Sequence, residues 1–277
     1  MTEALILRDV RDNVATLTMN NPTRLNGWTG EMMDALKAAL READRDDEVG
    51  AVVLTGAGDY YSAGVNLSST IQPQHPKKLH RFIVEHNQAL FDAFLDLDKP
   101  ILVAANGPAI GAVVTSATLC DGIIASDRAT FSTPFARLGI TPEGCSSVLF
   151  ERLMGADAVR MLGPEGWKPT AQEALDTGLV GWVVPHDQLA DEAHRIAAEW
   201  AAGGKMRSFR GDATREELHA VNARESVALA DAFLSPAFLD GQYRFLRSRK
   251  KHGPALMFLL LRLTHPLWSL LLPRSAP

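Results

Sequence analysis

The stretch from Asn106 to Leu149 places the strongest constraint on the fold. It runs from a glycine-bearing turn into a predicted helix over 111–119, a buried strand over 123–125, and a second predicted helix that starts at 141–144. Strands separated by helices predict an α/β fold. Two helix N-termini and one carboxylate, that of Glu143, are close in sequence. Because the first N–H groups of a helix lack partners, this stretch predicts a site for an anion or a developing oxyanion.

A purely structural explanation also exists for both helix starts. Residues 106–108, Asn-Gly-Pro, are typical of a turn, and Gly111 can simply allow a helix to pack closely on a strand. Thr141 as N-cap, Pro142 at the first helical position and Glu143 in the first turn satisfy ordinary helix-start preferences without any catalysis. A helix N-terminus would lower the pKa of Glu143, whereas burial would raise it. The apolar neighbours expected to bury it are Phe135, Leu138, Ile140 and Leu149.

Composition excludes several classes of protein. The 277 residues are 46% hydrophobic, which suffices for one large domain or a domain with an appendage. A formal net charge of −5 provides no overall positive field for phosphates, so no nucleic-acid partner is expected. Cys120 and Cys145 fall within predicted helices without metal-ligand spacing, which predicts buried thiols in a reducing compartment and no metal site. The start resembles no signal peptide and the end is not a peroxisomal signal, so we expect a cytoplasmic location.

The remaining elements follow from hydrophobic periodicity and helix-capping residues. The predicted strands cover 4–10, 14–19, 51–55, 101–105 and 180–184. The predicted helices cover 29–45, 80–97, 144–154, 156–162, 171–176, 188–202 and 215–234. Thr29 is the expected cap of the first helix, and Pro236 is expected to break the last. His80 and His86 are interpreted as solvated helix residues, because no third ligand lies in helical register.

The C-terminal part combines a basic run with an apolar tail. The cations of the run are Arg244, Arg247, Arg249, Lys250 and Lys251. Such a run is usually a solvated face, and a phosphate site is the alternative. The apolar stretch 255–272 is about long enough to span a bilayer, but Arg262, His265 and Pro266 in its middle disfavour spanning. We expect this segment to pack on the domain, on a partner subunit or at a membrane surface.

Four motifs in order carry a family resemblance over roughly residues 3–200. They read YYSAGVNL, NGPAIGA, CDGIIASDRATFSTP and WKPTAQEALDTGLVGWVV, and together they resemble the crotonase (enoyl-CoA hydratase/isomerase) superfamily. The resemblance implies a spiral core of ββα units over 1–200, a C-terminal helical trimerisation region over 201–254 and a hydrophobic tail over 255–277. It also implies an acyl-CoA thioester as substrate, with no metal or redox cofactor, and a homotrimer or hexamer.

The resemblance assigns catalytic roles to three residues. The segment STPFARLGITPEGCSS is most similar to peroxisomal-type Δ3,Δ2-enoyl-CoA isomerases, in which the glutamate of the PEG segment is the base, and this implies that Glu143 is the base here. An oxyanion hole is implied at the backbone N–H groups of Val65, after Gly64, and Ala112, after Gly111. Each such donor is worth roughly 2.7–4 kcal/mol to the transition state.

Coenzyme A is implied to follow the loops at 24–26 and 63–67. The backbone of Leu25, Ala63 and Val65 would line its path, with Asn66 nearby where the family commonly has an aspartate. The basic run at 244–251 falls where the family often meets the phosphates of coenzyme A, commonly from a neighbouring subunit.

The same comparison separates isomerase from hydratase. The two glutamates that a superfamily hydratase uses fall at Thr115 and Phe135, neither of which is a carboxylate. Water addition needs acid–base help at two places, whereas one base suffices to move a double bond from position 3 to position 2. We therefore expect an isomerase that converts 3-enoyl-CoA to trans-2-enoyl-CoA. The alternatives are an enoyl-CoA hydratase or other crotonase-type lyase, or a catalytically silent acyl-CoA-binding subunit that works through its tail. Peripheral membrane contact through the tail is compatible with each of these functions.

Overall fold

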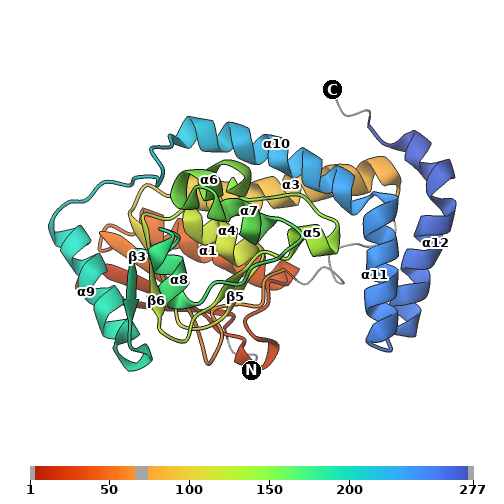
Figure 1. Ribbon diagram of the computed structural model, residues 1–277. Coiled ribbons are helices and arrows are strands. Elements are labelled where there is room, and N and C mark those ends of the chain that lie inside the picture. Colours follow the sequence, from red (N-terminus) through yellow and green to blue (C-terminus); the bar gives the residue numbers. More distant parts are fainter. Residues whose placement is uncertain (1–3, 66–73, 274–277) are drawn as a thin grey trace.

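A six-stranded sheet forms the centre of the computed structural model, which describes residues 4–65 and 74–273 (Figure 1). Its strand order is β1-β2-β3-β4-β6-β8, with β1 and β2 antiparallel and all other neighbours parallel. A second, two-stranded sheet pairs β5 with β7. The strands are β1 (Ile6–Arg11), β2 (Val14–Met19), β3 (Ala51–Gly56), β4 (Ile101–Ala105), β5 (Ala109–Ile110), β6 (Gly122–Ser126), β7 (Phe131–Ser132) and β8 (Trp182–Val184).

Helices cover both faces of the large sheet, which is why β4 and β6 are apolar and buried throughout. One face packs on α9, and the other packs on α1, α3, α4 and α6. The helices are α1 (Gly30–Arg45), α3 (Pro76–Leu95), α4 (Ala112–Thr118), α5 (Phe135–Leu138), α6 (Ser146–Met154), α7 (Asp157–Leu162), α8 (Ala171–Asp176), α9 (Leu189–Ala202), α10 (Arg215–Phe233), α11 (Pro236–Ser248) and α12 (His252–Trp268). Short 3-10 turns are η1 (Pro22–Arg24), η2 (His186–Gln188) and η3 (Ser269–Leu271). The predicted α/β class is confirmed.

Local sequence signals placed several elements correctly and misplaced the starts of others. The predicted hairpin and the Thr29 cap are confirmed, and the Thr29 hydroxyl accepts a hydrogen bond from the Met32 N–H at 3.3 Å. Helix α3 begins at Pro76, four residues before the predicted start at His80, because proline suits the first turn of a helix. For the same reason Pro236 does not merely break α10: it opens α11, with Ser235 as its cap.

The predicted helix start at 141–144 is wrong. Helix α6 begins at Ser146, because Gly144 and Cys145 both have φ of +63° and cannot be part of a right-handed helix. Cys145 is the N-cap of α6, and Cys120 lies just past the end of α4. The prediction that both cysteines lie inside helices is therefore wrong. Both thiols are buried and free, and burial raises the pKa of Cys120 to about 12 and that of Cys145 as well.

The two histidines of α3 differ in environment. His80 is only 7% exposed, and its Nε2 lies 2.9 Å from the Asp231 carboxylate on α10. The prediction that His80 is solvated is therefore wrong, because α10 covers that part of α3. His86 is exposed as predicted and packs against the ring of Phe82. Among residues 4–65 and 74–273, no group of three or more His, Cys, Asp or Glu side chains is arranged to hold a metal ion.

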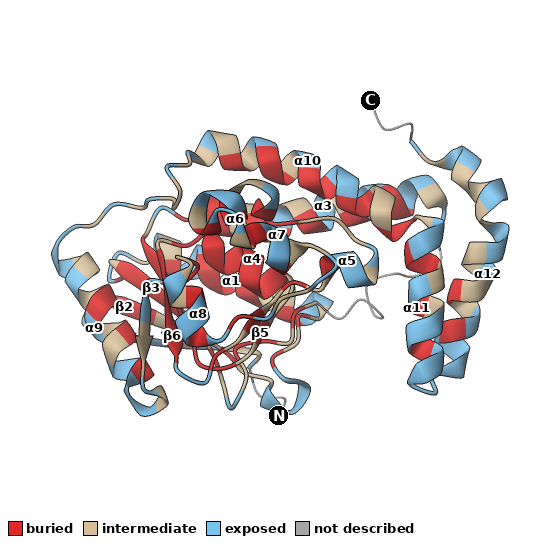
Figure 2. Ribbon diagram, viewed as in Figure 1, coloured by how far each residue is buried: buried red, intermediate tan, exposed pale blue. Residues whose placement is uncertain are grey.

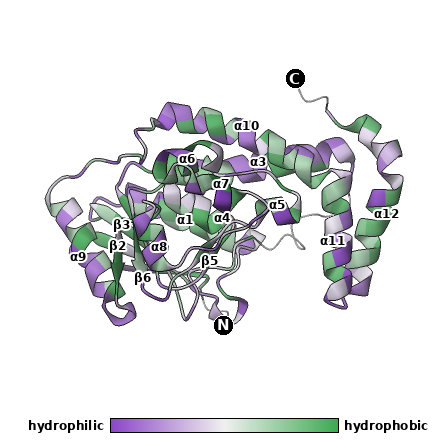
Figure 3. Ribbon diagram, in the orientation of Figure 1, coloured by the Kyte–Doolittle hydropathy of each residue, from purple (hydrophilic) through white to green (hydrophobic). Residues whose placement is uncertain are grey.

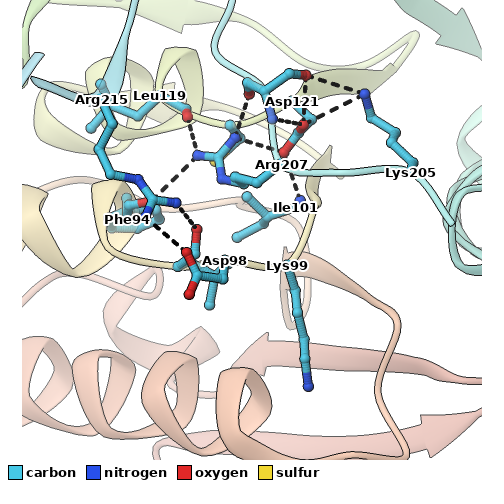
Figure 4. Close-up of polar contacts among 12 residues, drawn as sticks. Phe94, Asp98, Lys99, Ile101, Leu119, Asp121, Lys205, Arg207 and Arg215 are labelled. Atoms are coloured by element: carbon cyan, nitrogen blue, oxygen red, sulfur yellow. Dashed lines mark hydrogen bonds and ion pairs between the residues drawn. The ribbon is translucent and has the colours of Figure 1, made fainter. Parts of the chain in front are cut away.

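A buried ion pair anchors the segment that leads into α10 (Figure 4). The Asp121 carboxylate follows α4, and it accepts hydrogen bonds from the Arg207 guanidinium at 2.6 Å and from the Ile101 N–H at 2.9 Å. The second carboxylate oxygen accepts from the Ser208 N–H at 2.8 Å. Because both charged side chains are nearly inaccessible, removing one partner would leave an unpaired buried charge. This contact fixes the start of the chain that carries α10 along α3.

The chain ends in a helical hairpin of α11 and α12 at one side of the molecule (Figure 1). Ala255 and Phe258 of α12 are buried, whereas most of the remaining helix is exposed or half-buried (Figure 2). Figure 3 shows hydrophobic residues along much of its length. The segment His252–Leu271 is long and apolar enough to cross a membrane by length and composition alone.

Candidate active site

Two glycine turns bring the predicted oxyanion donors onto adjacent loops. Gly64 and Gly111 have φ of +78° and +70°, which side-chain-bearing residues rarely adopt. A Cβ on Gly64 would lie 2.1 Å from the carbonyl oxygen of Ile110, so only glycine allows the two loops to meet so closely. A Cβ on Gly111 would have no heavy atom within 4 Å, so its backbone conformation, rather than crowding, calls for glycine there.

The two donors that follow these glycines have no partner in the part of the chain that the structure describes. Ala112 is the first residue of α4, where an N–H has no partner within the helix. Val65 follows Gly64, whose carbonyl accepts the Trp28 N–H at 2.8 Å. Within the described residues, neither the Val65 N–H nor the Ala112 N–H has a hydrogen-bond acceptor. Such free N–H groups on touching loops are what an oxyanion hole requires.

Two asparagines that sequence reasoning missed hold these loops in place. The Asn26 amide is fully buried and donates to the carbonyls of Ala57 and Tyr60, at 2.9 and 2.8 Å. The Asn106 amide donates to the Gly58 carbonyl at 2.7 Å, while its oxygen accepts the Gly56 N–H at 3.2 Å. The loop after β3 is thus tied to side chains from two other loops. The only local signal was an asparagine beside a glycine or proline turn, which is common in ordinary turns.

Glu143 lies in an apolar pocket together with Val65. The pocket is lined by Met33, Val65, Ile83, His86, Asn87, Leu90, Glu143, Leu229 and Phe233. These residues come mainly from α1, α3 and α10. The apolar neighbours predicted from the sequence, Phe135, Leu138, Ile140 and Leu149, are not among the residues that line the pocket. Glu143 is 7% exposed, and its carboxyl group makes no hydrogen bond or ion pair with any described residue.

Burial and a neighbouring carboxylate set the charge state of Glu143. Burial, the larger effect, and the charge of Glu225 together raise the pKa of Glu143 to about 8. Glu225 itself accepts the N–H groups of Cys145 and Ser147, at 2.6 and 2.9 Å, and thereby caps α6 from α10. The N-terminus of α6 therefore stabilises the carboxylate of Glu225 and not that of Glu143. Of the two opposing effects expected on the pKa of Glu143, burial is the larger. A carboxyl group with a pKa near neutrality is suited to proton transfer.

The two positions that the resemblance gives to hydratase glutamates hold buried residues that cannot act as a carboxylate base. Thr115 lies on α4, is fully buried, and donates its hydroxyl to the Ala112 carbonyl at 3.1 Å. Phe135 opens α5 and is 2% exposed. The Thr115 hydroxyl would lie 2.7 Å from a Cβ on Gly144, which places the Glu143–Gly144 turn directly against α4. Glu143 is therefore held beside the helix whose first N–H is the predicted donor.

The residues predicted to bind coenzyme A are only partly assembled. Leu25 is 42% exposed, and its carbonyl accepts the Ala63 N–H at 2.9 Å, so the structure joins these two loops. Asn66 lies outside the described residues. The basic run at 244–251 lies on α11 and at its junction with α12, and none of its cations lines the Glu143 pocket.

Comparison with known proteins agrees with this arrangement. A model of the enoyl-CoA hydratase/isomerase family matches residues 9–252. The chain belongs to this family. A crystal structure of an enoyl-CoA hydratase/isomerase from Pseudoalteromonas atlantica T6c superposes with a TM-score of 0.75 at 31% sequence identity, and covers 88% of this chain and 97% of that one. An enoyl-CoA hydratase from Mycobacterium avium subsp. paratuberculosis K-10 gives a TM-score of 0.72 at 28% identity. The predicted crotonase superfamily and fold are confirmed.

The sequence relatives include both isomerases and hydratases. The chain is 36% identical to human enoyl-CoA delta isomerase 2 over 248 residues, which are 87% of this chain and 62% of the human protein. It therefore spans less than two thirds of that relative. It is also 33% identical to a probable enoyl-CoA hydratase from Mycobacterium tuberculosis H37Rv, over 90% of each protein.

Proposed function

We propose that this member of the family is a Δ3,Δ2-enoyl-CoA isomerase with Glu143 as its base. The observation that carries the proposal is the Glu143 carboxyl group, which has no partner among the described residues and is buried in an apolar pocket that Val65 also lines. A relative named as an enoyl-CoA delta isomerase at 36% identity supports the same reaction. The reaction needs neither a metal nor a redox cofactor, because only a proton and an electron pair move.

The reaction follows from these groups in two steps. The Glu143 carboxylate removes a proton from C2 of the 3-enoyl thioester, and the electron pair moves onto the thioester oxygen, which becomes a dienolate. The N–H groups of Val65 and Ala112 donate to that oxygen as its charge develops. Glu143 then returns the proton at C4, the carbonyl re-forms, and the double bond lies between C2 and C3. One carboxyl group thus removes and returns the same proton.

The pocket favours isomerisation over hydration. Hydration requires a second acid–base group to activate water, and the two expected positions hold Thr115 and Phe135. The nearby carboxylate of Glu225 already accepts two backbone N–H groups at the start of α6. The Leu229, Phe233 and Ile83 side chains offer an apolar surface for an acyl chain.

A parallel turnover assay tests this proposal. Purified protein is given 3-enoyl-CoA in one reaction and trans-2-enoyl-CoA in another, with Glu143→Gln as the variant. We expect fast conversion of the 3-isomer, little hydration of the 2-isomer, and a loss of about a hundredfold or more in the variant. Hydration as the main activity would favour the hydratase alternative. Binding of CoA thioesters without any turnover would favour the silent subunit.

We also propose that the protein is a homotrimer or hexamer, that it is cytoplasmic, and that the chain divides into three parts at residues 200 and 254. The loops that hold Leu25, Ala63 and Gly64 are proposed to line the path of coenzyme A. The division places the spiral core before α10, yet α10 supplies Leu229 and Phe233 to the Glu143 pocket, so the helical region would complete the site.

A further inference from the structure

The exposed face of α12 carries a stripe of leucines. Their spacing of four, three, four and three residues places them along one side of the helix. The stripe comprises Leu256, Leu260, Leu263 and Leu267 of α12 and Leu270 of the following η3, which are 54–83% exposed. Ala255 and Phe258 are buried, and α12 packs on α11 (Figures 1 and 2). Since water opposes so much exposed apolar surface, the stripe needs an apolar partner.

The charge around this stripe is strongly one-sided. Residues 241–277 contain seven Lys and Arg residues and no Asp or Glu, whereas the whole chain has a formal charge of −5. The first 240 residues therefore carry −12, and residues 241–277 carry +7. Asp240, near the start of α11, pairs with Arg244 at 2.6 Å. Five of the cations fall within 244–251, where α11 turns into α12.

More cations lie at the opposite end of α12. Lys77, Lys78 and Arg81, from the first turns of α3, line a groove with Pro273, which follows η3. The start of α3, which carries these cations, lies beside the C-terminal end of α12, and the basic run at 244–251 lies at its N-terminal end (Figure 1). An apolar stripe flanked by cations is complementary to a membrane whose apolar interior is covered by anionic headgroups.

We propose that α12 is a peripheral docking element that lies on an anionic lipid membrane, with its leucine stripe in the apolar layer and the flanking cations on the headgroups. The helix lies flat and does not span the membrane, because Ala255 and Phe258 stay packed on α11 and because Arg262 would otherwise sit in the middle of the hydrocarbon. The family match ends at residue 252, where α12 begins.

A second copy of the chain is the competing occupant. Two hairpins that met through their stripes would bring two strongly cationic segments together, each with Asp240 as its one acidic residue. Anionic lipid instead neutralises these charges, and it also accepts the leucines. Charge complementarity therefore favours the membrane over self-association.

Vesicle flotation with the full chain tests the proposal. Purified protein is mixed with vesicles of phosphatidylcholine alone or of equimolar phosphatidylcholine and phosphatidylglycerol. We expect binding to the anionic vesicles to be at least about tenfold tighter, and to weaken as salt is raised. Failure to bind either vesicle, or equal binding to both, would overturn the proposal.

Matched variants test whether vesicle binding depends on the leucine stripe or on any exposed apolar side chain. The double substitution Leu263→Glu with Leu267→Glu should weaken binding to anionic vesicles by about a hundredfold or more, because both side chains would otherwise leave water. Met206→Glu, at an 84% exposed site outside α12, should leave binding unchanged. Circular dichroism verifies that each variant is folded. Light scattering without lipid measures self-association of the parent and the double variant. If the double variant no longer self-associates but binds vesicles as the parent does, the stripe contacts a second copy of the chain and the proposal is overturned.

Discussion

Replacing Glu143 with glutamine should make the protein more stable at alkaline pH, at the expense of its chemistry. In the folded protein, burial and the charge of Glu225 raise the pKa of Glu143 from an ordinary 4.5 to about 8. Between these two values the folded state holds a proton that the unfolded chain releases. The stability contributed by the neutral acid is therefore lost as the pH rises through this window.

The size of the effect follows from the same shift. A rise from 4.5 to about 8 corresponds to a free-energy cost of about 5 kcal/mol for ionising Glu143 in the folded protein. Glutamine has nearly the same shape and no charge to bury. The variant should differ little from the parent well below the window and gain up to about 5 kcal/mol above it.

Urea unfolding of both proteins at several pH values measures this difference. The free energy of unfolding of the variant minus that of the parent should increase by about 1.4 kcal/mol per pH unit within the window. Glu151→Gln, an exposed position on α6, is the matched control and should show no such slope. A difference that stays constant with pH would refute the claim that Glu143 is a buried acid.

Three other substitutions probe the surroundings of the site. Glu225→Gln removes the negative charge beside Glu143, so the pH at which kcat/KM rises should decrease; an unchanged profile would contradict the electrostatic coupling. Gly64→Ala places a Cβ 2.1 Å from a carbonyl oxygen of the neighbouring loop, and should lower the free energy of unfolding in urea by about 1–3 kcal/mol and kcat/KM by about a hundredfold. Gly30→Ala, with open space at its Cβ, is the control and should change neither quantity. Equal effects of the two substitutions would be evidence against the oxyanion geometry. Asn106→Ala leaves a buried loop amide without its acceptor and should cost about 1–3 kcal/mol, also by urea unfolding; a loss well below this range would mean that water reaches the loop.

Elements specified by local chemistry were predictable from the sequence. The β1–β2 hairpin follows from alternating residues around a short turn, and the start of α1 follows from the Thr29 side chain. The start of α6 was not predictable, because the carboxylate that accepts the Cys145 N–H there belongs to Glu225, 80 residues later in the chain. A threonine and a proline at 141–142 look like a helix start until a distant carboxylate fixes the turn at Gly144.

The candidate site was predictable only where glycines mark the backbone. Gly64 and Gly111 belong to motifs that resemble the family, and the structure places their loops in contact. The burial of His80 was not predictable, because it depends on α10 packing along α3. Nor was the pocket around Glu143, whose lining comes from α1, α3 and α10. These are contacts between distant segments, and no local pattern encodes them.

The pH dependence of kcat/KM for 3-enoyl-CoA tests the central claim most directly, because this parameter reports the ionisation of the free enzyme. Since Glu143 must lose its proton before it can act as the base, kcat/KM should rise with pH through about 8 and then level off. A profile that is flat through this range, or that falls as the pH increases, would contradict the assignment of Glu143 as a buried catalytic base.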